Sequence, residues 1–245
     1  MPDRRDVSRG SPSGARTESE GLTGSEGLTE HRLVKIQAGP VTLEGNLHLA
    51  EGAKGLVVFV HGSGSSRNSP RNMYVAEELQ EAGLATLLFD LLTLEEEEVD
   101  LRTRSLRFDI GLLARRTIGA VDWLSQQPVT QSLKLGLFGA STGAAAALIA
   151  AAERPELVGA VVSRGGRPDL ASMALQRVEA PTLLIVGQLD ETVIELNEQA
   201  LGQMLPDTSK EMYIVPGATH LFEEPGALEF VARLAKDWFT RYLVA

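Results

Sequence analysis

Residues 133–143 read Leu-Lys-Leu-Gly-Leu-Phe-Gly-Ala-Ser-Thr-Gly, and an alanine-rich run follows them as far as Glu153. The first part predicts a buried strand and the second a helix, with Ser141 at the corner between them. Such a corner strains the backbone and brings its neighbours close together, which Gly139 and Gly143 allow because they have no Cβ. The N–H groups at the start of the helix favour negative charge there. The stretch therefore predicts Ser141 as a nucleophile, with a simple glycine turn as the structural alternative.

The composition fits one α/β domain. The chain has 245 residues, of which 43% are hydrophobic, enough for a full core. Its net charge of −10 predicts no nucleic-acid partner, because gripping phosphates requires clustered Lys and Arg. Cysteine is absent, which excludes disulfides, thiolate metal sites and a cysteine nucleophile. No stretch approaches about 18 consecutive apolar residues, so we expect a cytoplasmic protein with no membrane partner.

Residues 1–30 differ from the rest of the chain. They contain few apolar side chains, many Gly and Ser, and a repeated Ser-Glu-Gly-Leu-Thr at 19–23 and 25–29. Such a segment cannot bury enough surface to offset its ordering entropy. We therefore predict a flexible tail over residues 1–30, which reads as a dispensable leader rather than a partner motif. A single folded domain is predicted over residues 31–245.

Apolar runs and helical patterns alternate through that domain. Two alternating stretches, at 32–37 and 41–49, predict an antiparallel hairpin, in which His48 lies on the solvent side. Continuous apolar runs predict parallel strands covered on both faces: 56–60, 84–89, 157–162, 182–186 and 212–215. Helical patterns cover 70–81, 110–124 and 226–242. The order predicts a mostly parallel twisted sheet that opens with an antiparallel hairpin and has helices on both faces.

Two segments bear on access to the site. Residues 91–108 hold four glutamates at 95–98 followed by three arginines, a charge run typical of a solvated face rather than a metal site. Because the segment follows the end of a strand, we expect a flexible flap over the site. Only 18 residues, from Ser163 to Ala180, separate the strand ending at Val162 from Pro181. That leaves no room for a large cap domain and favours small substrates.

Three polar residues, Ser141, Asp190 and His220, each follow a predicted strand directly. The carboxyl ends of parallel strands lie along one edge of an open sheet, where ligands bind. We therefore expect the three side chains to converge as nucleophile, acid and base. Asp169 is an alternative acid, because it also lies beyond a strand end.

Four motifs carry a resemblance that covers the chain from about Leu33: His61-Gly62-Ser63-Gly64, residues 139–143, Gly187-Gln188-Leu189-Asp190 and Gly217-Ala218-Thr219-His220. With them the chain resembles an α/β-hydrolase of the dienelactone-hydrolase-like group. The resemblance implies the α/β-hydrolase fold and hydrolysis of a small ester or lactone through an acyl-enzyme, without cofactor or metal. The enzymes that name the group use cysteine as nucleophile, whereas this chain has serine. Some members of this lineage also resemble fusions with phosphoribosyltransferase domains.

The expected roles follow from this constellation. His220 takes the Ser141 proton, Asp190 orients the imidazole, and the backbone N–H groups of Ser63 and Thr142 form the oxyanion hole. Five further residues at the strand ends are candidates for substrate binding: His61, Gly62, Arg67, Arg164 and Arg167. Of these, His61 reads as structural rather than catalytic, and arginines that face the cleft would favour a carboxylate on the substrate.

Other functions stay open at this level. A fold does not guarantee its chemistry, so a catalytically silent member that binds a partner is one alternative. An acyltransferase or perhydrolase that uses the same triad is another. A dinucleotide-binding turn is disfavoured, because the glycine stretch lies in mid-chain and has no third close glycine. The sequence does not fix the oligomeric state.

Overall fold

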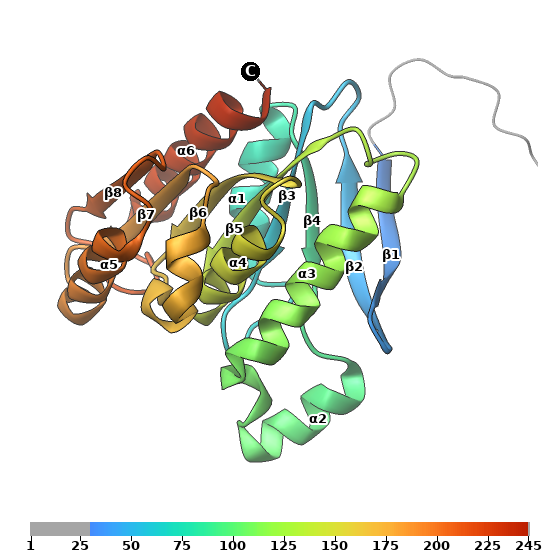
Figure 1. The fold of residues 1–245 in the computed structure, drawn as a ribbon, viewed down its shortest axis with the longest axis horizontal. Coiled ribbons are helices and arrows are strands. Elements are labelled where there is room, and N and C mark those ends of the chain that lie inside the picture. The colour runs from blue at the N-terminus through green and yellow to red at the C-terminus, as the bar shows by residue number, and fades with distance from the viewer. Residues whose placement is uncertain (1–29, 245) are drawn as a thin grey trace, which may run out of the picture.

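Figure 1 shows a computed structural model of the protein, which describes residues 30–244. The strands are β1 (Glu30–Ala38), β2 (Val41–Leu49), β3 (Gly55–Val60), β4 (Ala85–Phe89), β5 (Lys134–Ala140), β6 (Val158–Arg164), β7 (Thr182–Gly187) and β8 (Lys210–Val215). The α-helices are α1 (Pro70–Glu81), α2 (Leu94–Thr103), α3 (Ile110–Gln126), α4 (Thr142–Glu153), α5 (Glu191–Gln203) and α6 (Ala227–Phe239). The short helices are η1 (Leu106–Phe108), η2 (Pro168–Arg177) and η3 (Thr240–Val244).

The eight strands form one sheet in the order β1-β2-β4-β3-β5-β6-β7-β8. β2 pairs antiparallel with both β1 and β4, and the other neighbouring strands pair parallel. The predicted α/β-hydrolase architecture with its opening hairpin is therefore confirmed. The predicted tail lies outside the described residues, apart from Glu30, which begins β1.

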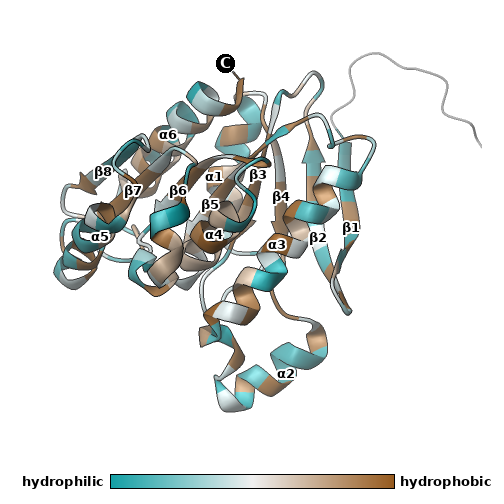
Figure 2. Cartoon of the chain, viewed as in Figure 1, coloured by the Kyte–Doolittle hydropathy of each residue, from teal (hydrophilic) through white to brown (hydrophobic). Residues whose placement is uncertain are grey.

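Helices cover both faces of the sheet, as the sequence predicts (Figure 1). One core lies under α3, α4 and α5 and contains Val58 and Leu137; the other lies under α1 and α6 and contains Val57 and Phe138. Neighbouring residues of a strand point to opposite faces of the sheet. Each central strand therefore has apolar side chains on both of its faces. Figure 2 shows these strands and α4 as predominantly hydrophobic. The small alanines of α4 let that helix lie close against the sheet.

Two glycines allow the turn from β5 into α4. A Cβ on Gly139 would lie 2.4 Å from Ala144 Cα and 2.9 Å from Gly143 O. A Cβ on Gly143 would lie 2.2 Å from Val60 O at the end of β3. Real Cβ atoms do not approach backbone atoms this closely, so the glycines of the motif are steric requirements of the corner.

Residues 91–108, the segment expected to form a flap over the site, contain two helices. They form α2 and η1, which project away from the sheet (Figure 1). Thr93 accepts the Glu96 N–H and the Glu96 carboxylate accepts the Thr93 N–H, which makes a capping box at the start of α2. The Thr-x-x-Glu pattern was the sequence signal for this helix. No cap domain is inserted after β6 within residues 30–244, where the connection holds only η2. In the same part of the chain, no helix is long and apolar enough to cross a membrane.

Candidate active site

Ser141 occupies a strained backbone position at the carboxyl edge of the sheet. Its φ of 50° and ψ of −122° lie in a region that non-glycine residues rarely adopt. The Ser141 N–H donates to Arg164 O at 3.2 Å, and the Arg167 N–H donates to Ser141 O at 3.0 Å. Both bonds tie the corner to the end of β6, and α4 begins at the next residue. These two hydrogen bonds therefore hold Ser141 in a tight turn directly before the N-terminus of α4.

His220 and Asp190 are in direct contact. His220 Nδ1 lies 2.6 Å from Asp190 Oδ2. Their loops, which follow β8 and β7, are joined by the Leu189 N–H donating to Ala218 O at 2.9 Å. Asp169, the alternative acid, instead accepts two hydrogen bonds from Arg167, at 2.8 and 2.7 Å. The structure thus places Asp190 on the histidine and pairs Asp169 with an arginine.

The turn after β6 adjoins both Ser141 and His220. Gly165 directly follows Arg164, whose carbonyl accepts the Ser141 N–H. A Cβ on Gly165 would lie 3.6 Å from His220 Nδ1. Side chains from the ends of β5, β7 and β8 therefore gather at one edge of the sheet around this turn.

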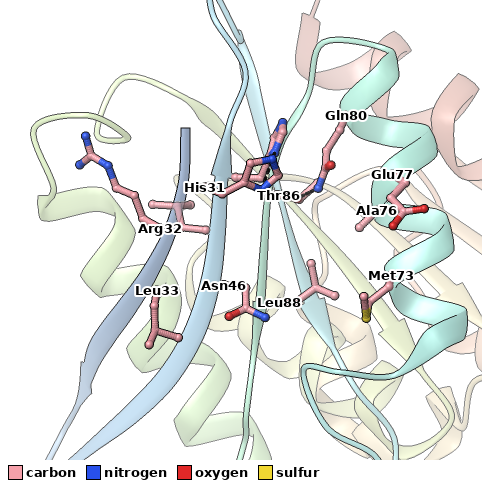
Figure 3. Close-up of a pocket in the computed structure, with 12 residues that line it drawn as sticks. His31, Arg32, Leu33, Asn46, Met73, Ala76, Glu77, Gln80, Thr86 and Leu88 are labelled. Carbon is pink, nitrogen blue, oxygen red and sulfur yellow. Dashed lines mark hydrogen bonds between the residues drawn. The ribbon is translucent and has the colours of Figure 1, made fainter. Parts of the chain in front are cut away.

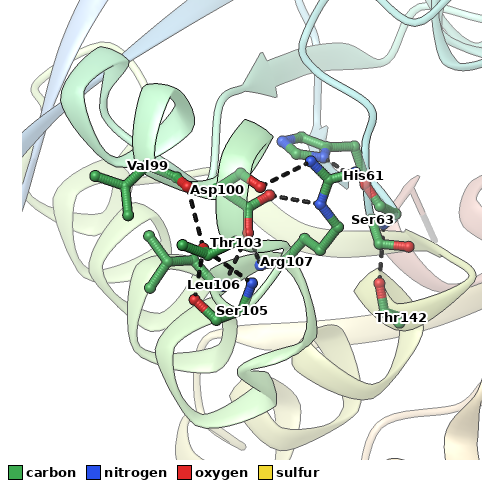
Figure 4. Close-up of polar contacts among 10 residues, drawn as sticks. His61, Ser63, Val99, Asp100, Thr103, Ser105, Leu106, Arg107 and Thr142 are labelled. Carbon is green, nitrogen blue, oxygen red and sulfur yellow. Dashed lines mark hydrogen bonds and ion pairs between the residues drawn. The ribbon is translucent and has the colours of Figure 1, made fainter.

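The loop after β3 lies against the other side of the corner. A Cβ on Gly62 would lie 3.0 Å from both Ala140 O and Ser141 Cβ, so Gly62 is required for close packing beside Ser141. The Ser63 N–H, one predicted oxyanion donor, donates to Thr142 Oγ1 at 3.0 Å (Figure 4). The two predicted oxyanion residues are therefore bonded to each other, because the Thr142 hydroxyl accepts the hydrogen bond from the Ser63 N–H.

The candidate substrate-binding arginines differ in their partners. Arg67 donates to Asp90 and, at 2.7 Å, to Glu44, and Arg167 is paired with Asp169 as above. The guanidinium groups of Arg67 and Arg167 are thus both paired with carboxylates of this chain. Arg164 is buried, and none of the described residues forms a hydrogen bond or ion pair with its side chain.

Comparison with known proteins agrees with this fold. The profile of the Dienelactone hydrolase family matches residues 44–243. The chain belongs to the dienelactone hydrolase family. A solved dienelactone hydrolase from Anabaena variabilis is 66% identical to it, with a TM-score of 0.86 over 88% of this chain and 99% of that one. Est1E from Butyrivibrio proteoclasticus has the same fold at 16% identity, with a TM-score of 0.70 over 85% of this chain and 98% of that one.

Two Mycobacterium tuberculosis relatives carry a different name. Each is called "Putative phosphoribosyl transferase" and is 59% identical over 210 residues, which make up 86% of this chain and 46% of the relative. This dienelactone hydrolase family member therefore spans about half the length of the curated relatives it matches.

His61 has a structural role in this family member. Its Nε2 accepts the Leu91 N–H at 3.1 Å, so Nδ1 carries the proton and donates to Gly62 O at 2.9 Å. The ring thereby links the loop after β3 to the loop after β4. Burial lowers the pKa of His61 from 6.5, outweighing the opposing effects of Gly62 O and Asp90. The ring is therefore neutral in the folded protein.

We expect acid to destabilise the fold through His61. The unfolded chain takes up a proton as the pH falls through about 6.5, whereas the folded chain resists it. The stability that neutral His61 contributes is therefore complete above this pH and is lost below it. Between about pH 8 and pH 5, Tm should fall more steeply for the wild type than for His61→Gln, which keeps an acceptor for Leu91 N–H and does not titrate. Parallel Tm curves would contradict this assignment.

An ion pair joins α2 to η1 beside the loop after β3 (Figure 4). Asp100, the only buried residue of α2, accepts the Leu106 N–H at 2.8 Å and Arg107 Nε at 2.5 Å. The Arg107 guanidinium reaches Gly64, where an added Cβ would lie 3.0 Å from Nη1. A cavity of about 100 Å³ lies between this ion pair and residues 61–65. The segment predicted to cover the site therefore borders the loop after β3.

A second pocket lies away from these residues, between β1, β2, β4 and α1 (Figure 3). It measures about 300 Å³ and contains no predicted catalytic residue. His31 and His48 meet there, with His48 Nδ1 3.2 Å from His31 Nε2. The expectation that His48 lies on the solvent side is wrong, because α1 covers this face and leaves His48 8% exposed. Within residues 30–244, no group of three or more His, Cys, Asp or Glu side chains is arranged to hold a metal ion.

Proposed function

We propose that this family member is a serine hydrolase that cleaves a small ester or lactone through an acyl-enzyme on Ser141. The observation that carries the proposal is the 2.6 Å contact between His220 Nδ1 and Asp190 Oδ2 beside the strained serine corner. Family membership supports hydrolysis, and the serine, histidine and acid supply the means for acyl transfer.

The proposed reaction proceeds in two halves. Because Nδ1 faces Asp190, His220 uses Nε2 to take the Ser141 proton while Oγ attacks the carbonyl carbon. As the tetrahedral intermediate collapses, His220 returns that proton to the leaving oxygen, and the acyl group stays on Ser141. His220 then takes a proton from a water molecule that attacks the acyl-enzyme. It returns this proton to Ser141 Oγ as the Oγ–acyl bond breaks and the acid is released. Asp190 orients the ring and stabilises its positive charge in both halves.

The backbone N–H groups of Thr142 and Ser63 are the proposed oxyanion donors. Thr142 is the first residue of α4, so its N–H lies at the positive end of a helix. In the structure the Ser63 N–H is bonded to Thr142 Oγ1, and a substrate oxygen would replace that hydroxyl. Loss of one such donor typically costs about 3 kcal/mol of transition-state stabilisation.

Two other functions share the same fold. An acyltransferase or perhydrolase would use the same acyl-enzyme with a different acceptor, and a silent member would bind a partner without turnover. The transferase name of the Mycobacterium tuberculosis relatives belongs to proteins of which the matched region is 46%. For that region, the hydrolase fold and the His220–Asp190 pair favour ester cleavage.

An activity screen tests the proposal. With p-nitrophenyl acetate and butyrate, we expect the wild type to release p-nitrophenol and a fluorophosphonate probe to label the protein. Adding an alcohol acceptor separates the enzyme classes, because an acyltransferase forms the new ester in preference to the acid. Neither p-nitrophenol release nor labelling is expected of a silent binding protein, and that result would overturn the proposal.

A further inference from the structure

Two histidines face each other across the first pair of strands, away from the predicted catalytic residues. His31 in β1 and His48 in β2 are directly opposite in the antiparallel register. Opposite residues of this kind have Cβ atoms about 5 Å apart, so their side chains can reach a common point. His48 Nδ1 lies 3.2 Å from His31 Nε2 and 3.3 Å from His31 Nδ1. The strand pairing therefore holds the two imidazole rings in contact.

The contact between the rings is a poor hydrogen bond. The lone pairs of the two His31 nitrogens diverge, and His48 Nδ1 is almost equidistant from both, so it lies along neither of them. The rings meet at 68° with their centroids 4.4 Å apart. Within residues 30–244, neither ring has another hydrogen-bond partner, although His48 is only 8% exposed. The nitrogens of this pair are therefore largely unused by the fold itself.

The spacing of the nitrogens fits two ligands of one metal ion. A tetrahedral ion held at about 2.0–2.1 Å from two imidazole nitrogens separates these nitrogens by about 3.3 Å. His48 Nδ1 and His31 Nε2 are 3.2 Å apart. His31 is exposed, so its ring can turn until the two lone pairs converge on a point between the strands. Imidazole ligands suit Zn²⁺, Cu²⁺ and Ni²⁺.

The cavity beside the pair has room for the other ligands of such an ion. It measures about 300 Å³, and Figure 3 shows Glu77 on α1 across the cavity from His31. The Glu77 carboxylate adds negative charge to the cavity wall, and Arg32, which also lines it, is paired with Glu30. Within residues 30–244, no third His, Cys, Asp or Glu is placed to complete the coordination shell. Water molecules in the cavity would supply the remaining ligands.

We propose that His31 and His48 bind one divalent transition-metal ion of the class that imidazole prefers, and that this ion links the edge strand β1 to β2. β1 is the first strand of the sheet order and pairs with β2 alone. His31 is the second residue of β1, so the ion adds a side-chain link at the end of a strand that backbone hydrogen bonds hold on one side only. The site is independent of the proposed function, because its cavity contains no predicted catalytic residue.

Calorimetric titration with Zn²⁺ tests the proposal on untagged protein freed of metal by a chelator. We expect one Zn²⁺ to bind per chain, and His31→Gln and His48→Gln each to weaken that binding by at least about tenfold, because a single imidazole remains. His220→Gln is the matched control, because it removes an imidazole on a different loop and should leave this Zn²⁺ affinity unchanged. No Zn²⁺ binding, or binding that survives in His31→Gln and is lost in His220→Gln, would overturn the proposal.

Two further measurements identify the ligands and the link between the strands. In the electron paramagnetic resonance spectrum of the Cu²⁺-loaded wild type, coupling to two imidazole nitrogens is expected, and to one in His31→Gln. Because His31 is exposed, this variant should fold normally, which its Tm without metal checks. Zn²⁺ should also slow amide hydrogen exchange at the start of β1 in the wild type and not in His31→Gln. A single nitrogen coupling in the wild type would contradict the paired site, and unchanged exchange in β1 would contradict the link.

Discussion

Ser141→Ala is expected to lower kcat for ester hydrolysis by at least about 10⁴-fold and to abolish formation of an acyl-enzyme. Alanine has no oxygen to attack the carbonyl, while the His220–Asp190 pair and the loop after β3 stay in place. The measurement is p-nitrophenyl butyrate turnover, with Tm as the check on folding. Alanine is smaller than serine and adopts the same backbone conformation at similar cost, so Tm should change little.

Ser172 offers a matched control. It has nearly the same backbone conformation as Ser141, with φ of 49° and ψ of −127°, and it is exposed in η2. No hydrogen bond links it to a histidine within the described residues. Strain alone does not make a nucleophile, so Ser172→Ala should retain full turnover. Loss of activity in Ser172→Ala but not in Ser141→Ala would reverse the assignment.

Asp190→Asn should lower kcat by about 10⁴-fold. An asparagine amide would donate a hydrogen bond to His220 Nδ1, which leaves the proton on Nε2, where the ring then cannot accept one from Ser141. The substitution also removes the negative charge that stabilises the imidazolium. The fall should appear in kcat with a small change in KM, because the acid acts on the transition state.

Asp169→Asn is the control for that measurement. Asp169 is paired with Arg167 and has no contact with His220, so its substitution should affect stability more than kcat. A loss of kcat in Asp169→Asn that equals or exceeds the loss in Asp190→Asn would favour the alternative acid.

The sequence predicts best those parts of the fold whose structure depends on a short local pattern of residues. The strand-to-helix corner at Ser141 shows in its glycines, and the buried parallel strands show in their continuous apolar runs. The helices α2 and α5 escaped prediction because their sequences are polar and mixed, although the Thr93–Glu96 capping box marked the start of α2. A helix that buries little carries a weak periodic signal.

The candidate site also has a part that the sequence predicts and a part that it does not. The rule that strand ends share one edge predicts an acid near His220. It leaves both Asp190 and Asp169 as candidates, and the structure shows that Asp190 is the one that contacts the ring. The partners of the arginines do not follow from any such rule. Arg67 meets Glu44 of β2 and Asp90 of the loop after β4. Only the three-dimensional structure shows that no acid within residues 30–244 pairs with Arg164 in the same way. The burial of His48 likewise depends on where α1 packs.

Mass spectrometry of the fluorophosphonate-treated wild type locates the nucleophile. After labelling, digestion and peptide mapping, one adduct per chain is expected, on the peptide that contains Ser141, with no adduct in Ser141→Ala and full labelling in Ser172→Ala. An adduct on another residue of the wild type, or none in a protein that hydrolyses esters, would contradict an acyl-enzyme on Ser141.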